Sequence, residues 1–308
     1  MKCEKILIRE DGSSVLYSYI LDSEISYKKY KKRPAIVICP GGSYLFCATK
    51  EGEPVASRFL GMGYNVFVLR YITYFKNRIS NSNEKPLINK NSKYPEQVLD
   101  LMRVIRMIKN NSEQWGIDKE NIFTMGFSAG GHIVASLGNN WDDDSFLEAI
   151  EERDKEICKP KGTILCYPMI HGTLLENYNV DDAPESIKYQ LPYIKKAIFG
   201  TNDVDNKMLE KVNVINSIRK DMPPTFIWHT SEDNITFAKD SVLYAMKMLE
   251  LNIPCEVHIF ERGHHGMALC DEVSSSLPSD INNENKIWPI LANNWMKLQM
   301  ENKENANK

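Results

Sequence analysis

The chain has 308 residues, with 38 Lys and Arg against 41 Asp and Glu and a formal net charge of −3. Hydrophobic residues make up 43% and charged residues 26% of the chain, which excludes a wholly disordered protein, a collagen and a disulfide-stapled miniprotein. This charge balance gives no global attraction to nucleic acid or to an anionic membrane, and we expect neither as a partner.

The N-terminal residues show no sustained apolar run and no small-residue cleavage pattern, so we expect no secretory signal and a cytoplasmic protein. No stretch approaches the length of a membrane span. The seven cysteines form no C-x-x-C pair, and we expect reduced thiols rather than metal ligands or disulfides. The oligomeric state is left open, a homo-oligomer included.

Short apolar runs alternate with helical patterns along the chain. Residues 6–8 and 15–20 are expected to form an antiparallel pair around a turn at Asp11 and Gly12. Further strands are predicted at 34–39, 65–69, 121–126, 162–168, 225–230 and 255–260, and helices at 52–60, from 95 onward, 129–137, 237–249 and 287–300. Strands that alternate with helices predict an α/β fold, with a mostly parallel sheet covered by helices on both faces.

No repeat or linker divides the chain, so we expect residues 1–308 to form a single domain. The polar stretch at 72–94 is predicted to be an exposed insertion. The long mixed stretch at 142–222 is interpreted as a second insertion, over the edge of the sheet. The polar tail at 301–308 is expected to fray.

A G-x-S-x-G pattern occupies residues 126–130, between a predicted strand and a predicted helix. Small residues on both sides of Ser128 permit a tight turn that lifts the serine hydroxyl out at the end of the sheet. The N-terminus of the following helix places unpaired N–H groups near a developing negative charge. The pattern therefore predicts that Ser128 is a nucleophile.

A serine nucleophile needs a histidine base that a carboxylate orients, and in this type of fold the carboxylate precedes the histidine along the chain. Asp233 follows the strand predicted at 225–230, so its side chain is expected at the carboxyl edge of the sheet. Glu232 competes for the same role. We predict Asp233 as the orienting carboxylate.

Two adjacent histidines, His264 and His265, follow the strand predicted at 255–260 and lie between glycines that permit a sharp loop. Spacing alone leaves open which of them reaches Ser128. A metal site is not expected here, because no Cys, Asp or Glu lies at ligand spacing beside the pair. The other histidines are expected to be packing or surface residues: His132, His171, His229 and His258.

A glycine pair follows the strand predicted at 34–39, at the place where a second donor to an acyl oxyanion belongs. Glycines allow backbone N–H groups to face a substrate. We therefore predict an oxyanion hole that is built from the N–H groups of Gly42 and Ser43 on one side and of Ala129 on the other.

These segments resemble α/β-hydrolases of the esterase/lipase branch, in particular acetyl-xylan-esterase-like and carbohydrate-esterase-like members. Hormone-sensitive-lipase-like esterases and kynurenine formamidases are groups related to these members. The resemblance implies an α/β-hydrolase fold, and it implies His265 rather than His264 as the base. Pro40 and Ser43 depart from the His-Gly-Gly-Gly loop of lipases, which argues against long-chain lipid substrates. The matching segments are residues 39–44, 51–56, 63–67, 126–132, the Asp233 loop and 263–266.

The resemblance implies a serine carboxylesterase with the triad Ser128, Asp233 and His265. Its substrates would be small-molecule or oligosaccharide esters with short, chiefly acetyl, acyl groups on sugars or xylo-oligosaccharides, cleaved through an acyl-enzyme. No organic cofactor or metal is expected. The alternative is an amide or peptide hydrolase of the same fold. A non-catalytic binding protein on this scaffold would lack a triad member, and none is missing.

Overall fold

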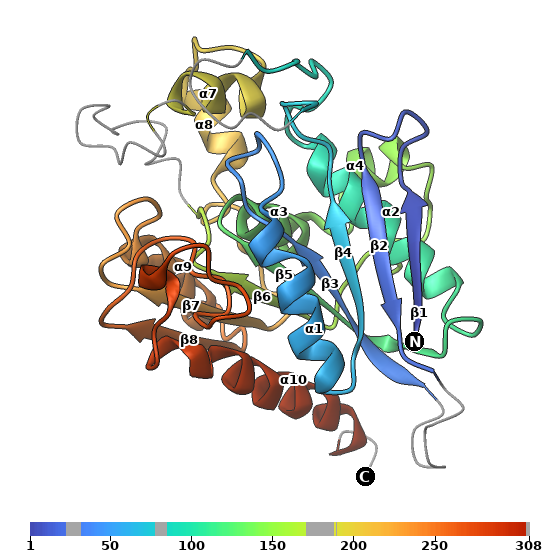
Figure 1. Ribbon diagram of the computed structural model, residues 1–308. Helices are drawn as coiled ribbons and strands as arrows, with labels where there is room; N and C mark the ends of the chain where they lie inside the picture. The colour runs from blue at the N-terminus through green and yellow to red at the C-terminus, as the bar shows by residue number, and fades with distance from the viewer. Residues whose placement is uncertain (23–31, 78–84, 171–187, 189, 306–308) are drawn as a thin grey trace.

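The computed structural model shown in Figure 1 describes residues 1–22, 32–77, 85–170, 188 and 190–305. Several predictions fall outside these residues: parts of the two insertions (78–84, 171–187 and 189), His171, and the last residues of the tail (306–308). Among the helices that are described, none is both long and apolar enough to cross a membrane.

The described part of the chain forms one eight-stranded sheet in the order β1-β2-β4-β3-β5-β6-β7-β8. β2 pairs antiparallel with β1 and with β4, and the strands from β4 to β8 run parallel. The predicted, mostly parallel sheet and the opening antiparallel pair are thus confirmed. The strands are β1 Lys2–Leu7, β2 Val15–Ile20, β3 Arg33–Cys39, β4 Asn65–Arg70, β5 Ile117–Phe127, β6 Gly162–Cys166, β7 Thr225–Thr230 and β8 Cys255–Phe260.

Helices cover both faces of the sheet, and each face has its own apolar core. One core lies under α2, α3 and α9, and the other under α1 and α10. Two further helices, α7 and α8, lie together at the end of the molecule far from α10 (Figure 1). The helix bounds are α1 Glu53–Gly61, α2 Glu96–Asn110, α3 Ala129–Asn140, α4 Asp144–Ala149, α7 Leu191–Phe199, α8 Asn206–Val212, α9 Ala238–Glu250 and α10 Trp288–Asn305.

The stretch at 142–222 was predicted to be one insertion. The structure corrects this prediction, because β6 lies within the stretch. β6 is an inner strand that pairs with β5 on one side and β7 on the other. All of its residues are buried, because this short apolar segment packs against helices on both faces. The described flanking segments, which carry α4, α7 and α8, lie outside the sheet.

The stretch at 72–94 was predicted to be an exposed insertion, but part of its described portion is buried. The side chains of Ile72 and Phe75 are 1% and 4% exposed. The N–H of Phe75 donates to the carbonyl of Leu45, so this stretch packs against the loop after β3. The closing helix is longer than predicted, because α10 continues through Asn305 rather than ending at residue 300. Glu and Lys at 301–304 favour helix, which explains why the tail extends α10.

Candidate active site

Ser128 occupies the turn between β5 and α3 with a φ of 51°, a strained value for a residue other than glycine. The turn closes only because its neighbours lack side chains. A Cβ on Gly126 would lie 2.2 Å from the carbonyl oxygen of Gly130, and a Cβ on Gly130 would lie 2.0 Å from that of Cys39. The Ser128 N–H donates to the carbonyl of Cys166 at 3.0 Å, which fixes the turn to β6.

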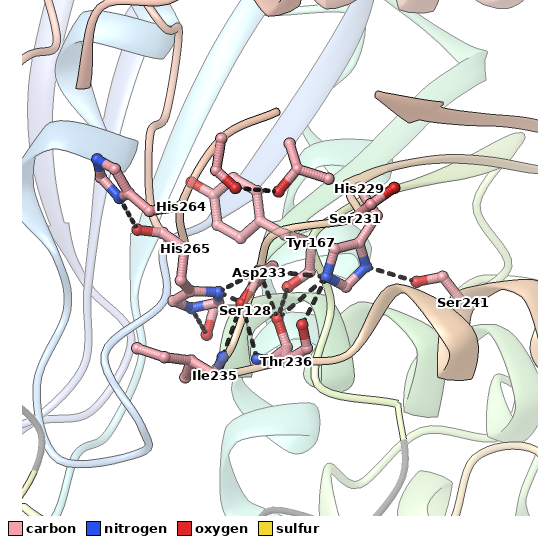
Figure 2. A network of polar contacts seen from close by, with 12 residues as sticks. Ser128, Tyr167, His229, Ser231, Asp233, Ile235, Thr236, Ser241, His264 and His265 are labelled. Atoms are coloured by element: carbon pink, nitrogen blue, oxygen red, sulfur yellow. Dashed lines mark hydrogen bonds and ion pairs between the residues drawn. The ribbon is translucent and has the colours of Figure 1, made fainter. Parts of the chain in front are cut away.

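The structure brings Ser128, His265 and Asp233 together from three separate strand ends (Figure 2). The Nε2 atom of His265 lies 2.8 Å from Ser128 Oγ, and its Nδ1 atom lies 2.7 Å from an oxygen of Asp233. The His265 side chain is 13% exposed, whereas that of Asp233 has no exposed surface. A neutral histidine in this geometry donates from Nδ1 to the carboxylate and accepts the serine proton at Nε2.

The buried carboxylate of Asp233 is surrounded by donors. Its Oδ1 accepts the N–H groups of Ile235 and Thr236, and its Oδ2 accepts from His265 and from the Thr236 hydroxyl. Burial alone would raise the pKa of Asp233, but the charge of His265 and the hydrogen bonds from His229 and His265 outweigh it and hold this pKa well below its usual range. Asp233 is therefore ionised at neutral pH.

The two neighbours that competed for these roles lie elsewhere. Glu232 accepts the N–H of Gly263 at 2.9 Å and so ties the turn after β7 to the loop after β8. His264 points away from Ser128 in Figure 2, with its Nδ1 2.8 Å from the carbonyl of His265 and its Nε2 3.2 Å from Asp280. Glu232 and His264 thus help to shape the loop that carries His265.

Replacing Asp233 by asparagine is expected to lower kcat by about four orders of magnitude, because an amide can stabilise the wrong tautomer of His265. The matched control is Glu232→Gln, which keeps an oxygen for Gly263 and is expected to cost less than tenfold. Initial rates on p-nitrophenyl acetate would measure both. Equal losses for Asp233→Asn and Glu232→Gln would contradict this role for Asp233.

His229 was expected to be a packing or surface residue, and it is fully buried in β7. It also contacts the site, which the sequence pattern did not predict. Its Nε2 lies 3.2 Å from Asp233 and 2.8 Å from the carbonyl of Thr236, while Nδ1 lies 2.9 Å from the Ser241 hydroxyl. Thr236 was also missed, although its hydroxyl lies 3.0 Å from Nδ1 of His265. The one signal for His229 is its place near the end of β7, four residues before Asp233.

The glycine loop, residues 40–44, follows β3 beside the Ser128 turn. Gly42 has a φ of 127°, and a Cβ there would lie 2.0 Å from the carbonyl oxygen of Phe46, so glycine is required. In the described part of the chain no acceptor takes the N–H of Gly42 or of Ser43. Ala129 begins α3, where first-turn N–H groups have no acceptor within the helix. The predicted donors thus lie on the two segments beside the Ser128 hydroxyl.

His132 ties this loop to the helices outside the sheet. It is buried, with Nδ1 2.6 Å from the Tyr44 hydroxyl and Nε2 2.6 Å from the carbonyl of Val212. A neutral ring satisfies both partners, since it donates from Nε2 and accepts at Nδ1. Burial lowers the pKa of His132 to about 4, against a smaller opposing effect of the Val212 carbonyl.

Stability is therefore expected to depend on the titration of His132. An unfolded histidine has a pKa of about 6.5, so the unfolded chain binds the proton first as the pH falls. The stability present above pH 6.5 is lost as the pH falls toward 4, with about 2 kcal/mol lost between pH 7 and pH 5. Urea unfolding of His132→Gln should lack this part of the pH dependence, whereas His258→Gln should keep it. An unchanged slope in His132→Gln would contradict the prediction.

The described residues contain no group of three or more His, Cys, Asp or Glu side chains that could hold a metal ion. All seven cysteines lie in the described part of the chain and have free thiols. Cys39 and Cys166 are buried in the core, where burial raises the pKa of both thiols well above the ordinary value. Both thiols are therefore poor nucleophiles.

The chain is similar to several hydrolases. The family model BD-FAE matches residues 21–248. Endo-1,4-beta-xylanase B of Butyrivibrio fibrisolvens is 28% identical over 261 residues, which are 83% of this chain and 35% of that protein. Acetylxylan esterase of Xylanibacter ruminicola is 23% identical over 235 residues, which are 75% of this chain and 40% of that protein. The chain thus spans less than half the length of either curated relative.

Among solved structures, the acetyl ester-xyloside bifunctional hydrolase of Caldicellulosiruptor lactoaceticus matches with a TM-score of 0.69 and 28% identity, over 96% of this chain and 95% of that one. This likeness and the order of the sheet confirm the predicted α/β-hydrolase fold. The BD-FAE match takes in β3, the Ser128 turn and the Asp233 turn, and covers most of the sheet. The chain belongs to the BD-FAE family.

Proposed function

We propose that the protein is a serine carboxylesterase that hydrolyses short-acyl, chiefly acetyl, esters of sugars or xylo-oligosaccharides. The observation that carries this proposal is the continuous hydrogen-bonded chain from Ser128 Oγ through His265 to the ionised Asp233. The sugar ester as substrate class is supported by the names of an acetylxylan esterase relative and of the acetyl ester-xyloside hydrolase neighbour.

In the proposed mechanism, His265 takes the Ser128 proton at Nε2 while Ser128 Oγ attacks the ester carbonyl. The resulting oxyanion accepts hydrogen bonds from the N–H of Ala129 and of Gly42 or Ser43, and each such donor contributes about 3 kcal/mol to the transition state. His265 then gives its proton to the leaving alkoxide, and the acyl group remains on Ser128. Water deprotonated by His265 attacks this acyl-enzyme and releases the acid.

A panel of substrates tests the proposal: p-nitrophenyl acetate, butyrate and octanoate, acetylated xylo-oligosaccharides, and N-formylkynurenine as the amide. We expect kcat/KM to fall from acetate to octanoate, acetate to be released from the xylo-oligosaccharides, and the amide to react far more slowly. A higher kcat/KM for N-formylkynurenine than for every ester would favour an amide hydrolase on the same triad instead. Octanoate as the best ester would contradict the short-acyl preference.

A further inference from the structure

Glu51 is a carboxylate inside the molecule, at the end of the short helix η1 (Thr49–Glu51), and only 3% of it is exposed. Its Oε2 accepts the N–H of Gly41 at 2.6 Å, and its Oε1 accepts the hydroxyl of Tyr167 at 2.7 Å. Burial raises the pKa of Glu51, while these two donors favour its ionised form. Burying a carboxylate costs free energy, and the hydrogen bonds from Gly41 and Tyr167 offset this cost. The two contacts therefore indicate what Glu51 does in the molecule.

The first contact reaches the glycine loop next to the nucleophile. A Cβ on Gly41 would lie 2.8 Å from Glu51 Oε2 and 2.9 Å from the Cβ of Ser128. The backbone of Gly41 is therefore held between the carboxylate and the serine. Because Glu51 takes the N–H of Gly41, that N–H is not available to a substrate, whereas the N–H groups of Gly42 and Ser43 have no acceptor in the described part of the chain.

The second contact reaches the loop that carries the base. Tyr167 directly follows β6, and its hydroxyl also accepts the N–H of Ala268 at 3.0 Å, three residues after His265. The Tyr167 ring lies edge-on to the His265 imidazole, with the ring centres 5.1 Å apart (Figure 2). The hydroxyl oxygen of Thr236 lies 3.0 Å from the Tyr167 carbonyl, and it also contacts Asp233 and His265.

We propose that Glu51 and Tyr167 form a bridge that holds the glycine loop and the His265 loop at their working separation. This inference rests on the proposed function, and it makes Glu51 and Tyr167 positioning residues. Neither needs to contact the substrate. The bridge sets the distance between the oxyanion donors on one side of Ser128 and the base on the other, and small errors in such a distance are costly in rate.

The test compares Glu51→Gln, Tyr167→Phe and the double variant with wild type on p-nitrophenyl acetate. Gly41 and Tyr167 donate to different oxygens of Glu51, and glutamine replaces one of these oxygens by an NH2 group that donates and cannot accept, so one of the two hydrogen bonds is lost. We expect each single variant to lower kcat about 10- to 100-fold with KM within about twofold, because positioning acts on the transition state. The double variant should lose no more than the larger single loss, since both changes break one bridge.

Phosphonylation of Ser128 by a fluorophosphonate, followed by intact mass, gives a second readout that needs the same donors and base. It should slow in parallel with kcat in the single variants. The matched control is Glu53→Gln, an exposed carboxylate two residues along the same segment, which should keep wild-type kcat and labelling rate.

Folded variants that keep wild-type kcat would overturn the inference and leave Glu51 as a structural acid only. Losses that multiply in the double variant would also overturn it, because the residues would then act independently. If Glu51→Gln fails to fold, the test uses Tyr167→Phe, which keeps the aromatic ring. Its kcat and labelling rate then support or contradict the bridge in the same way. A wild-type protein with no Ser128-dependent ester turnover would instead overturn the proposed function, and this inference with it.

Discussion

Replacing Ser128 by alanine is expected to lower kcat for p-nitrophenyl acetate by about a million-fold, the size of loss found when the nucleophile of a serine hydrolase is removed. Ser128 Oγ is the atom that would carry the acyl group, and His265 is already placed to take its proton. The residual rate should come only from the oxyanion donors and from binding. Rates at high enzyme concentration, with fluorophosphonate labelling in parallel, measure the effect.

The control for Ser128→Ala is Ser231→Ala, which removes an exposed serine hydroxyl at the end of β7 and should leave kcat unchanged. Both variants should unfold at temperatures close to the unfolding temperature of wild type. This control shows that a loss of activity does not result from unfolding. Full activity in Ser128→Ala would exclude the proposed mechanism. Labelling at another serine would locate the nucleophile elsewhere.

Replacing His265 by alanine is expected to lower kcat by a similar factor, whereas His264→Ala should cost less than tenfold. The physical reason is geometric: His265 contacts both Ser128 and Asp233, while His264 contacts the His265 carbonyl and Asp280. The pair is well matched, because the two residues are adjacent and chemically identical. The same rate assay applies, and loss of turnover in His264→Ala with activity retained in His265→Ala would reverse the assignment.

The fold was largely predictable because its strands are short apolar runs bounded by turn residues. The helix pattern from residue 95 onward became α2, and the run at 162–168 became β6. The two insertions were predicted less well, because β6 lies within 142–222 and because part of 72–94 is buried. The stretch at 72–94 is polar in composition, yet Phe75 and Ile72 are buried because they pack against a loop that is distant in sequence. Composition does not reveal such long-range contacts.

The three residues of the proposed triad could be brought together from sequence because each follows a strand, and parallel strands end at the same edge of a sheet. The choice between His264 and His265 could not follow from spacing, since both residues follow the same strand, and the family resemblance supplied it. Their directions depend on the loop backbone, where Gly263 has a φ of 132°. Glu51 and His229 were missed as site neighbours because their roles consist only of tertiary contacts.

The pairing of β3 with β5 has a practical consequence for redesign. Cys39 and Gly126 are register partners, so the glycine loop and the Ser128 turn leave the sheet one strand spacing apart, about 4.8 Å. That separation is set by backbone hydrogen bonds, which side-chain changes on α7 and α8 leave intact. Those two helices lie outside the sheet, so the spacing between the glycine loop and the Ser128 turn stays under the control of the strands when side chains on α7 or α8 are changed.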